Sequence, residues 1–168
     1  MKQALKVTLA AATLVVGALA WWQVGASAPQ APKVGYTLLD GSRHSTADLQ
    51  GRVVLVNFWA TSCSTCIKEM PRIVETHDKF KDRGYTTLSV AMSYDPPAYV
   101  MNFAESRKLP FPVAIDNTGE IAQSFDQVRL TPTTFLINRK GEIVKRYVGE
   151  PDFAALHTLV EELLGQSS

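Results

Sequence analysis

The sequence is poor in cysteine. Its 168 residues include only two, Cys63 and Cys66, with two residues between them. A structural zinc site needs four ligands, and the three histidines, His44, His77 and His157, have no spacing that completes such a set. A structural disulfide across so short a loop would restrict the unfolded chain very little. These absences favour a redox pair over a metal site or inert packing.

An excess of charge is also lacking. The chain has 17 basic and 16 acidic residues, for a net charge of +1, and no basic face interleaved with aromatic residues. We therefore expect no binding to nucleic acid. Internal repeats and low-complexity tracts are absent as well. With 46% hydrophobic residues, a chain of this length can bury one substantial core and still carry an appendage.

The two cysteines follow a short apolar run. Residues 53–56 contain only Val and Leu and lead to Phe58 and Trp59, a pattern typical of a strand buried on both faces. Good helix formers follow the cysteines, so we expect Cys63 at a helix N-terminus. The peptide dipoles there lower a thiol pKa from about 8.5 to roughly 3.5–7.5. This placement predicts a reactive thiol.

A spacing of three residues recurs along the expected helix. It places Cys66 on the turn next to Cys63, close enough for the two to form a disulfide. Glu69 repeats the same step after Cys66. We therefore regard Glu69 as a candidate proton acceptor for Cys66.

Two motifs resemble the signatures of the thioredoxin superfamily. The first is Phe58-Trp59-Ala60 with Cys63-Ser64-Thr65-Cys66 and Pro71, and the second is Thr131-Pro132-Thr133. The resemblance implies a cis peptide bond before Pro132, opposite the dithiol. Residues 68–71, the segment 98–115 and the N-terminal hydrophobic stretch are similar to extracytoplasmic, membrane-anchored reductases of the TlpA/ResA type. The resemblance covers residues 34–164.

The resemblance implies an α/β, thioredoxin-like fold with a central mixed sheet flanked by helices. The hydrophobic patterns predict an N-terminal hairpin over residues 34–44 and a strand–helix insertion made by a helix at 98–108 and a strand at 113–115. Further strands are expected at 53–59, 85–92, 133–137 and 142–148, and further helices at 63–83, 119–125 and from 151 onward. His77, among charged neighbours, is expected to be solvated.

The sequence departs from the superfamily pattern in three ways. Asn57 stands where cytoplasmic thioredoxins carry a buried acid, and an amide cannot take up a proton. The resemblance to ResA-like proteins therefore implies that Glu69 serves as the acid/base. Ser62 replaces the usual tryptophan before the first cysteine, which reduces the apolar rim of the site. Ser64-Thr65 replaces the commoner pairs that contain proline.

The first 28 residues are predicted to be an export signal or a membrane anchor. Lys2 and Lys6 precede an apolar run, residues 7–24 suit membrane association, and Ala26-Ser27-Ala28 fits a cleavage site. Residues 29–33 are predicted to be a linker and residues 34–168 the thioredoxin-like domain. The domain is thus expected in the periplasm or another extracytoplasmic space.

We interpret the protein as a thiol-disulfide oxidoreductase without metal or cofactor. Trp59 and Pro132 are expected to form an apolar rim, and the backbone of Thr131 to pair with a substrate peptide. Family resemblance favours a reductant, supplied by a membrane thiol donor of the CcdA/DsbD type and acting in cytochrome c maturation or copper-centre assembly. The alternatives are a disulfide-inserting oxidant, and a copper-binding assembly protein that adds His157 to the cysteines.

Overall fold

The computed structural model describes residues 28–166. The predicted signal or anchor, up to residue 27, lies outside the described residues. Within residues 28–166, no helix combines the length and the apolar character that crossing a membrane requires.

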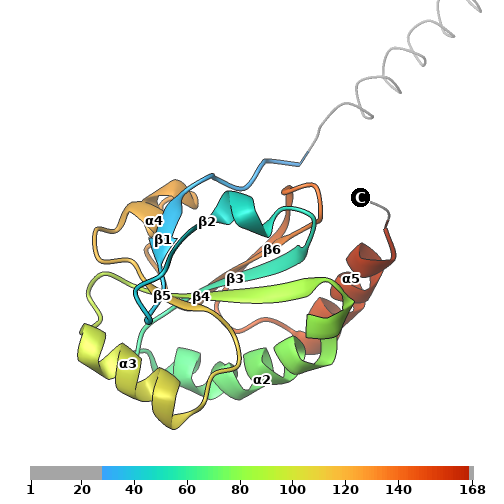
Figure 1. The fold of residues 1–168 in the computed structure, drawn as a ribbon. Helices are drawn as coiled ribbons and strands as arrows, with labels where there is room; N and C mark the ends of the chain where they lie inside the picture. The colour runs from blue at the N-terminus through green and yellow to red at the C-terminus, as the bar shows by residue number, and fades with distance from the viewer. Residues whose placement is uncertain (1–27, 167–168) are drawn as a thin grey trace, which may run out of the picture.

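A five-stranded mixed sheet forms the centre of the molecule (Figure 1). The strands are β3 (Val53–Trp59), β4 (Tyr85–Ala91), β5 (Val113–Ile115), β6 (Thr133–Ile137) and β7 (Ile143–Val148), in the order β5-β4-β3-β6-β7. β3 is parallel to β4, which is parallel to β5, whereas β6 is antiparallel to both β3 and β7. The predicted mixed sheet and fold class are therefore confirmed.

Strand β3 is central because both of its faces are apolar. Val53, Leu55 and Trp59 belong to one buried cluster, and Val56 and Phe58 belong to the other. Alternate side chains of a strand point to opposite faces, so each face needs its own cover. A sheet covered on both sides is the arrangement that an uninterrupted Val/Leu run predicts.

The helices divide between the two faces (Figure 1). α2 (Ser64–Phe80), α3 (Pro97–Ser106) and α5 (Phe153–Gly165) pack on the face that carries Leu55 and Trp59. The hairpin of β1 (Gly35–Thr37) and β2 (Arg43–Ser45) and the short helix α4 (Glu120–Ser124) cover the other. Short 3₁₀ turns follow β2 at Thr46–Leu49 and α2 at Lys81–Arg83. The predicted hairpin and strand–helix insertion are both present.

One sequence-based expectation is wrong. His77 is buried rather than solvated, because it lies on the same inward face of α2 as Ile73 and Phe80. The centroid of its ring lies 5.4 Å from that of Phe111, and its Nδ1 lies 3.3 Å from the hydroxyl of Thr87. Burial lowers the pKa of His77 below its ordinary value. Charged neighbours in sequence hid this apolar environment.

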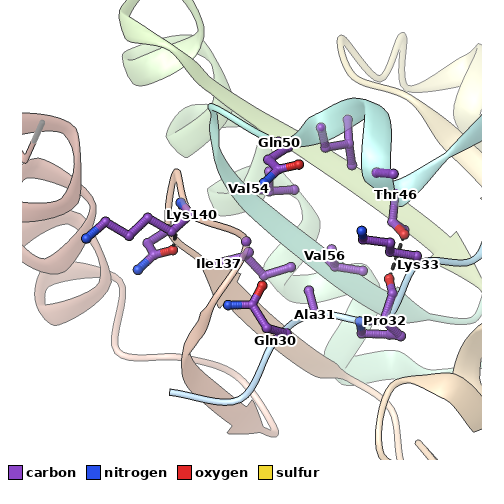
Figure 2. Close-up of a pocket in the computed structure, with 14 residues that line it drawn as sticks. Gln30, Ala31, Pro32, Lys33, Thr46, Gln50, Val54, Val56, Ile137 and Lys140 are labelled. Atoms are coloured by element: carbon purple, nitrogen blue, oxygen red, sulfur yellow. Dashed lines mark hydrogen bonds between the residues drawn. The ribbon is translucent and has the colours of Figure 1, made fainter. Parts of the chain in front are cut away.

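The segment predicted as a linker, residues 29–33, is docked on the domain. Ile143 donates its N–H to the carbonyl of Pro29, and Ala31 donates to the carbonyl of Gly141, each at 2.8 Å. The segment is therefore bonded to the start of β7, the edge strand of the sheet. Figure 2 shows it bordering a pocket with Val54 and Ile137.

Candidate active site

The two cysteines lie where the central strand passes into a helix. After β3, Cys63 closes a turn by donating its N–H to the carbonyl of Ala60 at 3.1 Å. Cys63 is the N-cap of α2, and its sulfur accepts the N–H of Cys66 at 3.1 Å. The two residues form a disulfide with a Cα–Cα distance of 5.2 Å. Cys63 is half-buried and Cys66 is buried, so the first cysteine is the accessible one.

The Thr131-Pro132 segment lies beside the end of β3. Thr133 pairs with Phe58 in the sheet register, which brings the residues before β6 to the end of β3 from which the dithiol turn leaves. The Thr131–Pro132 peptide bond is cis, as the family resemblance implies. Pro132 accepts the N–H of Gly149 through its carbonyl at 2.8 Å. This bond fastens the segment to the end of β7.

Glu69 lies on the inner face of α2 and is fully buried. Asn57 donates its side-chain amide to Glu69 Oε1 at 3.0 Å and also to the hydroxyl of Thr134 at 3.0 Å. Within residues 28–166, Glu69 Oε2 has no hydrogen-bond partner. Burial, reinforced by the negative charge of Glu150 and opposed by the Asn57 bond, raises the pKa of Glu69 to about 7. A carboxyl group with such a pKa can exchange protons at neutral pH.

Trp59 does not form the exposed rim that the sequence predicts. Its side chain is fully buried and packs against the ring of Phe103, with ring centroids 5.1 Å apart. The physical reason is the strand alternation, which directs Trp59 to the face covered by helices. Pro132 is buried too, and Thr131 is half-buried. Neither Trp59 nor the side chain of Pro132 offers a substrate an open apolar surface here.

Two large side chains that the sequence did not single out are exposed beside this segment instead. Leu130, the residue before Thr131, is 66% exposed. Tyr94, in the loop after β4, is 58% exposed, and its hydroxyl lies 3.3 Å from that of Thr131. The expected strands gave a signal for them, because a residue that follows β4 and one that precedes the antiparallel β6 lie at the same edge of the sheet.

Asp95 and Thr61 were also missed from sequence. Asp95 is 2% exposed and accepts two hydrogen bonds from Thr61. β3 and β4 are parallel with Trp59 opposite Ala91, so the loops that leave them are adjacent. In the sequence, Asp95 reads only as a residue before two prolines that begin a helix.

The histidines lie away from the dithiol. His157 Nε2 lies 2.8 Å from the hydroxyl of Thr76, which is about 15 Å along α2 from Cys66 at 1.5 Å per residue. The copper-binding alternative requires His157 beside both cysteines. The structure therefore contradicts the choice of His157 as a copper ligand. Within residues 28–166, no group of three Cys, His, Asp or Glu side chains is arranged to hold a metal ion.

The pocket of Figure 2 does not belong to this site. Val54 and Val56, in the first half of β3, contribute to its wall, whereas the dithiol follows the last residue of that strand. The dithiol and the Thr131-Pro132 segment thus lie together at the other end of the sheet.

A mixed sheet with helices on both faces, a Cys-x-x-Cys disulfide at the start of a helix and a cis-proline segment beside it define a thioredoxin-like thiol-disulfide oxidoreductase. The Redoxin family model matches residues 23–160. The ResA thiol-disulfide oxidoreductase of Bacillus thuringiensis subsp. konkukian is 37% identical over 121 residues, which are 72% of this chain and 69% of that protein. ResA of Bacillus subtilis is 36% identical over 118 residues, 70% of this chain and 65% of its own.

Solved structures agree with this class. A thiol:disulfide interchange protein of the thioredoxin family from Chlorobium tepidum superposes with a TM-score of 0.75 at 28% identity, covering 83% of this chain and 99% of its own. The chain belongs to the Redoxin family and is a ResA-like thiol-disulfide oxidoreductase.

The raised pKa of Glu69 makes a prediction about stability. The group keeps its proton in the folded protein up to about pH 7 but loses it near pH 4.5 when unfolded. The contribution of Glu69 to the free energy of unfolding is therefore fully present below pH 4.5 and is lost as the pH rises through 7. The total loss is about 3 kcal/mol. We expect Glu69→Gln to remove this loss, so that the variant gains stability over the wild type by about 3 kcal/mol between pH 4 and pH 8.

Urea unfolding of the disulfide form at several pH values measures this difference. Glu75→Gln, at an exposed position of the same helix, is the matched control and should follow the wild-type curve. A constant gap between Glu69→Gln and the wild type across the range would show that the pKa of Glu69 is the same in the folded and the unfolded protein.

Proposed function

We propose that the protein reduces disulfides of other proteins outside the cytoplasm, with Cys63 as the attacking thiol and Cys66 as the resolving thiol. The observation that carries this proposal is the pair of cysteines at the start of α2, the first partly accessible and the second buried. A thiol at a helix N-terminus is favoured as thiolate, which is the attacking species. A buried Cys66 can react only with the adjacent sulfur of Cys63.

The reaction takes place in two exchange steps. The Cys63 thiolate attacks one sulfur of the substrate disulfide, so that a Cys63–substrate bond forms, the substrate bond breaks and the other substrate sulfur leaves and takes up a proton. Cys66 then attacks the Cys63 sulfur, forms the intramolecular disulfide and releases the second substrate thiol. Two electrons pass from the protein to the substrate.

Glu69 is the base for the second step. Burial disfavours the Cys66 thiolate, so the thiol needs an acceptor for its proton. Glu69 lies one turn further along the same helix, and its pKa of about 7 matches that task. The buried amide of Asn57 orients the carboxyl group through a 3.0 Å bond.

An extended substrate segment is proposed to lie along Thr131. Its backbone would pair with that of Thr131, as an added strand pairs with a sheet edge. Tyr94 and Leu130 offer exposed apolar surface on either side of Thr131, and Val148 is exposed opposite Thr133 on β7. These side chains provide the apolar rim that was expected from Trp59. They also replace the apolar surface that is lost because Ser62 stands in the place of the usual tryptophan.

Family resemblance supports electron flow from the protein to its substrates. A reductant outside the cytoplasm needs electrons from within, and a membrane thiol donor of the CcdA/DsbD type would supply them by the same exchange chemistry. Residues 7–24 would hold the protein near that donor. Suitable substrates are exported proteins whose cysteines must be reduced before a metal cofactor is attached, such as apocytochrome c or a copper-centre assembly factor.

The two-step mechanism predicts opposite outcomes for the two cysteines. Cys66→Ser should accumulate a mixed disulfide between Cys63 and substrate, because no thiol remains to resolve it. Cys63→Ser should form none and lose exchange activity. Non-reducing electrophoresis with mass spectrometry detects the adduct, and Cys66→Ser turning over at the wild-type rate would contradict the mechanism.

The docking surface predicts selective loss of protein substrates. Leu130→Ser removes apolar contact worth roughly 1 kcal/mol, so kcat/KM for a protein disulfide should fall about fivefold. Reduction of a small aromatic disulfide, which needs no docking, should be unchanged. Met101→Ser is the control, because Met101 is 50% exposed but lies on α3. Equal losses in both variants would remove the specific role of Leu130.

The reduction potential separates reductant from oxidant. A reductant of this class should have a potential of about −250 mV or lower, whereas strong disulfide-inserting oxidants lie near −120 mV. Equilibration of the Cys63–Cys66 pair with glutathione buffers measures it. A value near that of the oxidants would favour the alternative function.

A further inference from the structure

The loop between β4 and α3, residues 92–96, contacts both halves of the active site. Asp95 Oδ2 accepts the backbone N–H of Thr61 at 2.6 Å, and Asp95 Oδ1 accepts its hydroxyl at 2.5 Å. On the other side, the hydroxyl of Tyr94 lies 3.3 Å from that of Thr131. Two consecutive residues thus join the dithiol turn to the cis-proline segment.

The loop that carries Asp95 is itself held in place. Met92 donates its N–H to the carbonyl of Trp59 at 2.9 Å, which continues the pairing of β3 with β4. Asp95 donates its N–H to the carbonyl of Met92 at 3.0 Å, and Pro96 and Pro97 restrict the backbone that follows. The carboxylate of Asp95 is therefore a fixed acceptor.

Thr61 transmits this constraint to the reactive sulfur. It lies two residues before Cys63, inside the turn closed by the bond from Cys63 N–H to Ala60. With its N–H and its hydroxyl both fixed by Asp95, Thr61 limits how the turn can move. The sulfur of Cys63 then stays 3.1 Å from the N–H of Cys66, the donor at the start of α2.

We propose that Asp95 is a positioning residue for the dithiol, which acts through Thr61 to hold the Cys63 sulfur against the first free N–H groups of α2. Tyr94 fastens the substrate-facing Thr131 to the same loop, so that one loop sets the spacing between the two parts of the site. This inference rests on Cys63 being the attacking thiol, as proposed above.

A second buried carboxylate provides a matched comparison. Asp116 is 1% exposed and also accepts two hydrogen bonds, from the N–H groups of Ile121 at 3.1 Å and Ala122 at 2.8 Å. Those bonds fix the start of α4, on the face of the sheet opposite α2. A purely structural role for Asp95 would resemble that of Asp116.

The test follows the thiolate of Cys63 directly. The Cys66→Ser background leaves one thiol in the chain, and its rate of alkylation by iodoacetamide as a function of pH gives its pKa. Thr61→Val removes the hydroxyl bond but keeps the N–H bond. We expect it to raise the Cys63 pKa by about half a unit, a roughly threefold loss of thiolate below the pKa.

Two further variants separate positioning from general destabilisation. Thr61→Ser restores the hydroxyl and should return the Cys63 pKa to that of the Cys66→Ser background. Asp116→Asn should lower the unfolding temperature without moving the Cys63 pKa. An unchanged pKa in Thr61→Val, or an equal shift in Asp116→Asn, overturns the proposal.

A double-mutant cycle tests whether Thr61 acts through Asp95. In an Asp95→Asn background, Thr61→Val should shift the Cys63 pKa by less than half as much as it does alone. Both proteins compared in that background lack the charge of Asp95, so the loss of this charge does not contribute to the difference between them. An equal shift in both backgrounds would show that Thr61 acts independently of Asp95. If Cys63 titrates near 8.5 in the Cys66→Ser background itself, the proposed function fails instead.

Discussion

The pairing of β3 with β4 on one side and β6 on the other is the constraint on which the site depends. Trp59 lies opposite Ala91, and Phe58 lies opposite Thr133. One end of β3 therefore meets the loop after β4 and the segment before β6. The dithiol turn, Tyr94-Asp95 and Thr131-Pro132 come together because three strands keep one register, although Thr131 lies 68 positions after Cys63 in the sequence.

The same strand carries a buried polar group into the core. Asn57 shares its face of β3 with Val53, Leu55 and Trp59, and that face packs against α2. Its amide donates to Glu69 and Thr134, while Asn57 Oδ1 and Glu69 Oε2 have no hydrogen-bond partner among the residues that the structure describes. A buried unpaired acceptor costs about 1–3 kcal/mol, and more when it is charged. Protonation of Glu69 reduces that cost, which is the physical reason its pKa is high and why it can exchange a proton near pH 7.

Sequence reasoning reached the parts of the fold that local patterns determine. The Val/Leu run of β3 predicted the central strand and the cysteine spacing predicted the disulfide, whereas the cis peptide bond before Pro132 was implied by the family resemblance. It failed where tertiary contacts decide. Charged neighbours masked the burial of His77, and the bonds from residues 29–31 to residues 141–143 had no signal in the sequence. Asp95 and Thr61 carried no motif, because their contact exists only through strand pairing.

The correction of Trp59 bears on how the site recognises its substrate. Trp59 is fully buried and packs on Phe103, so recognition of a substrate is left to other residues. With Ser62 before Cys63, the rim next to the sulfur is polar and small. Exposed apolar surface lies instead at Tyr94 and Leu130, on loops that follow β4 and precede β6. The apolar surface that we propose for substrate contact therefore lies on the two loops beside the nucleophile's own turn.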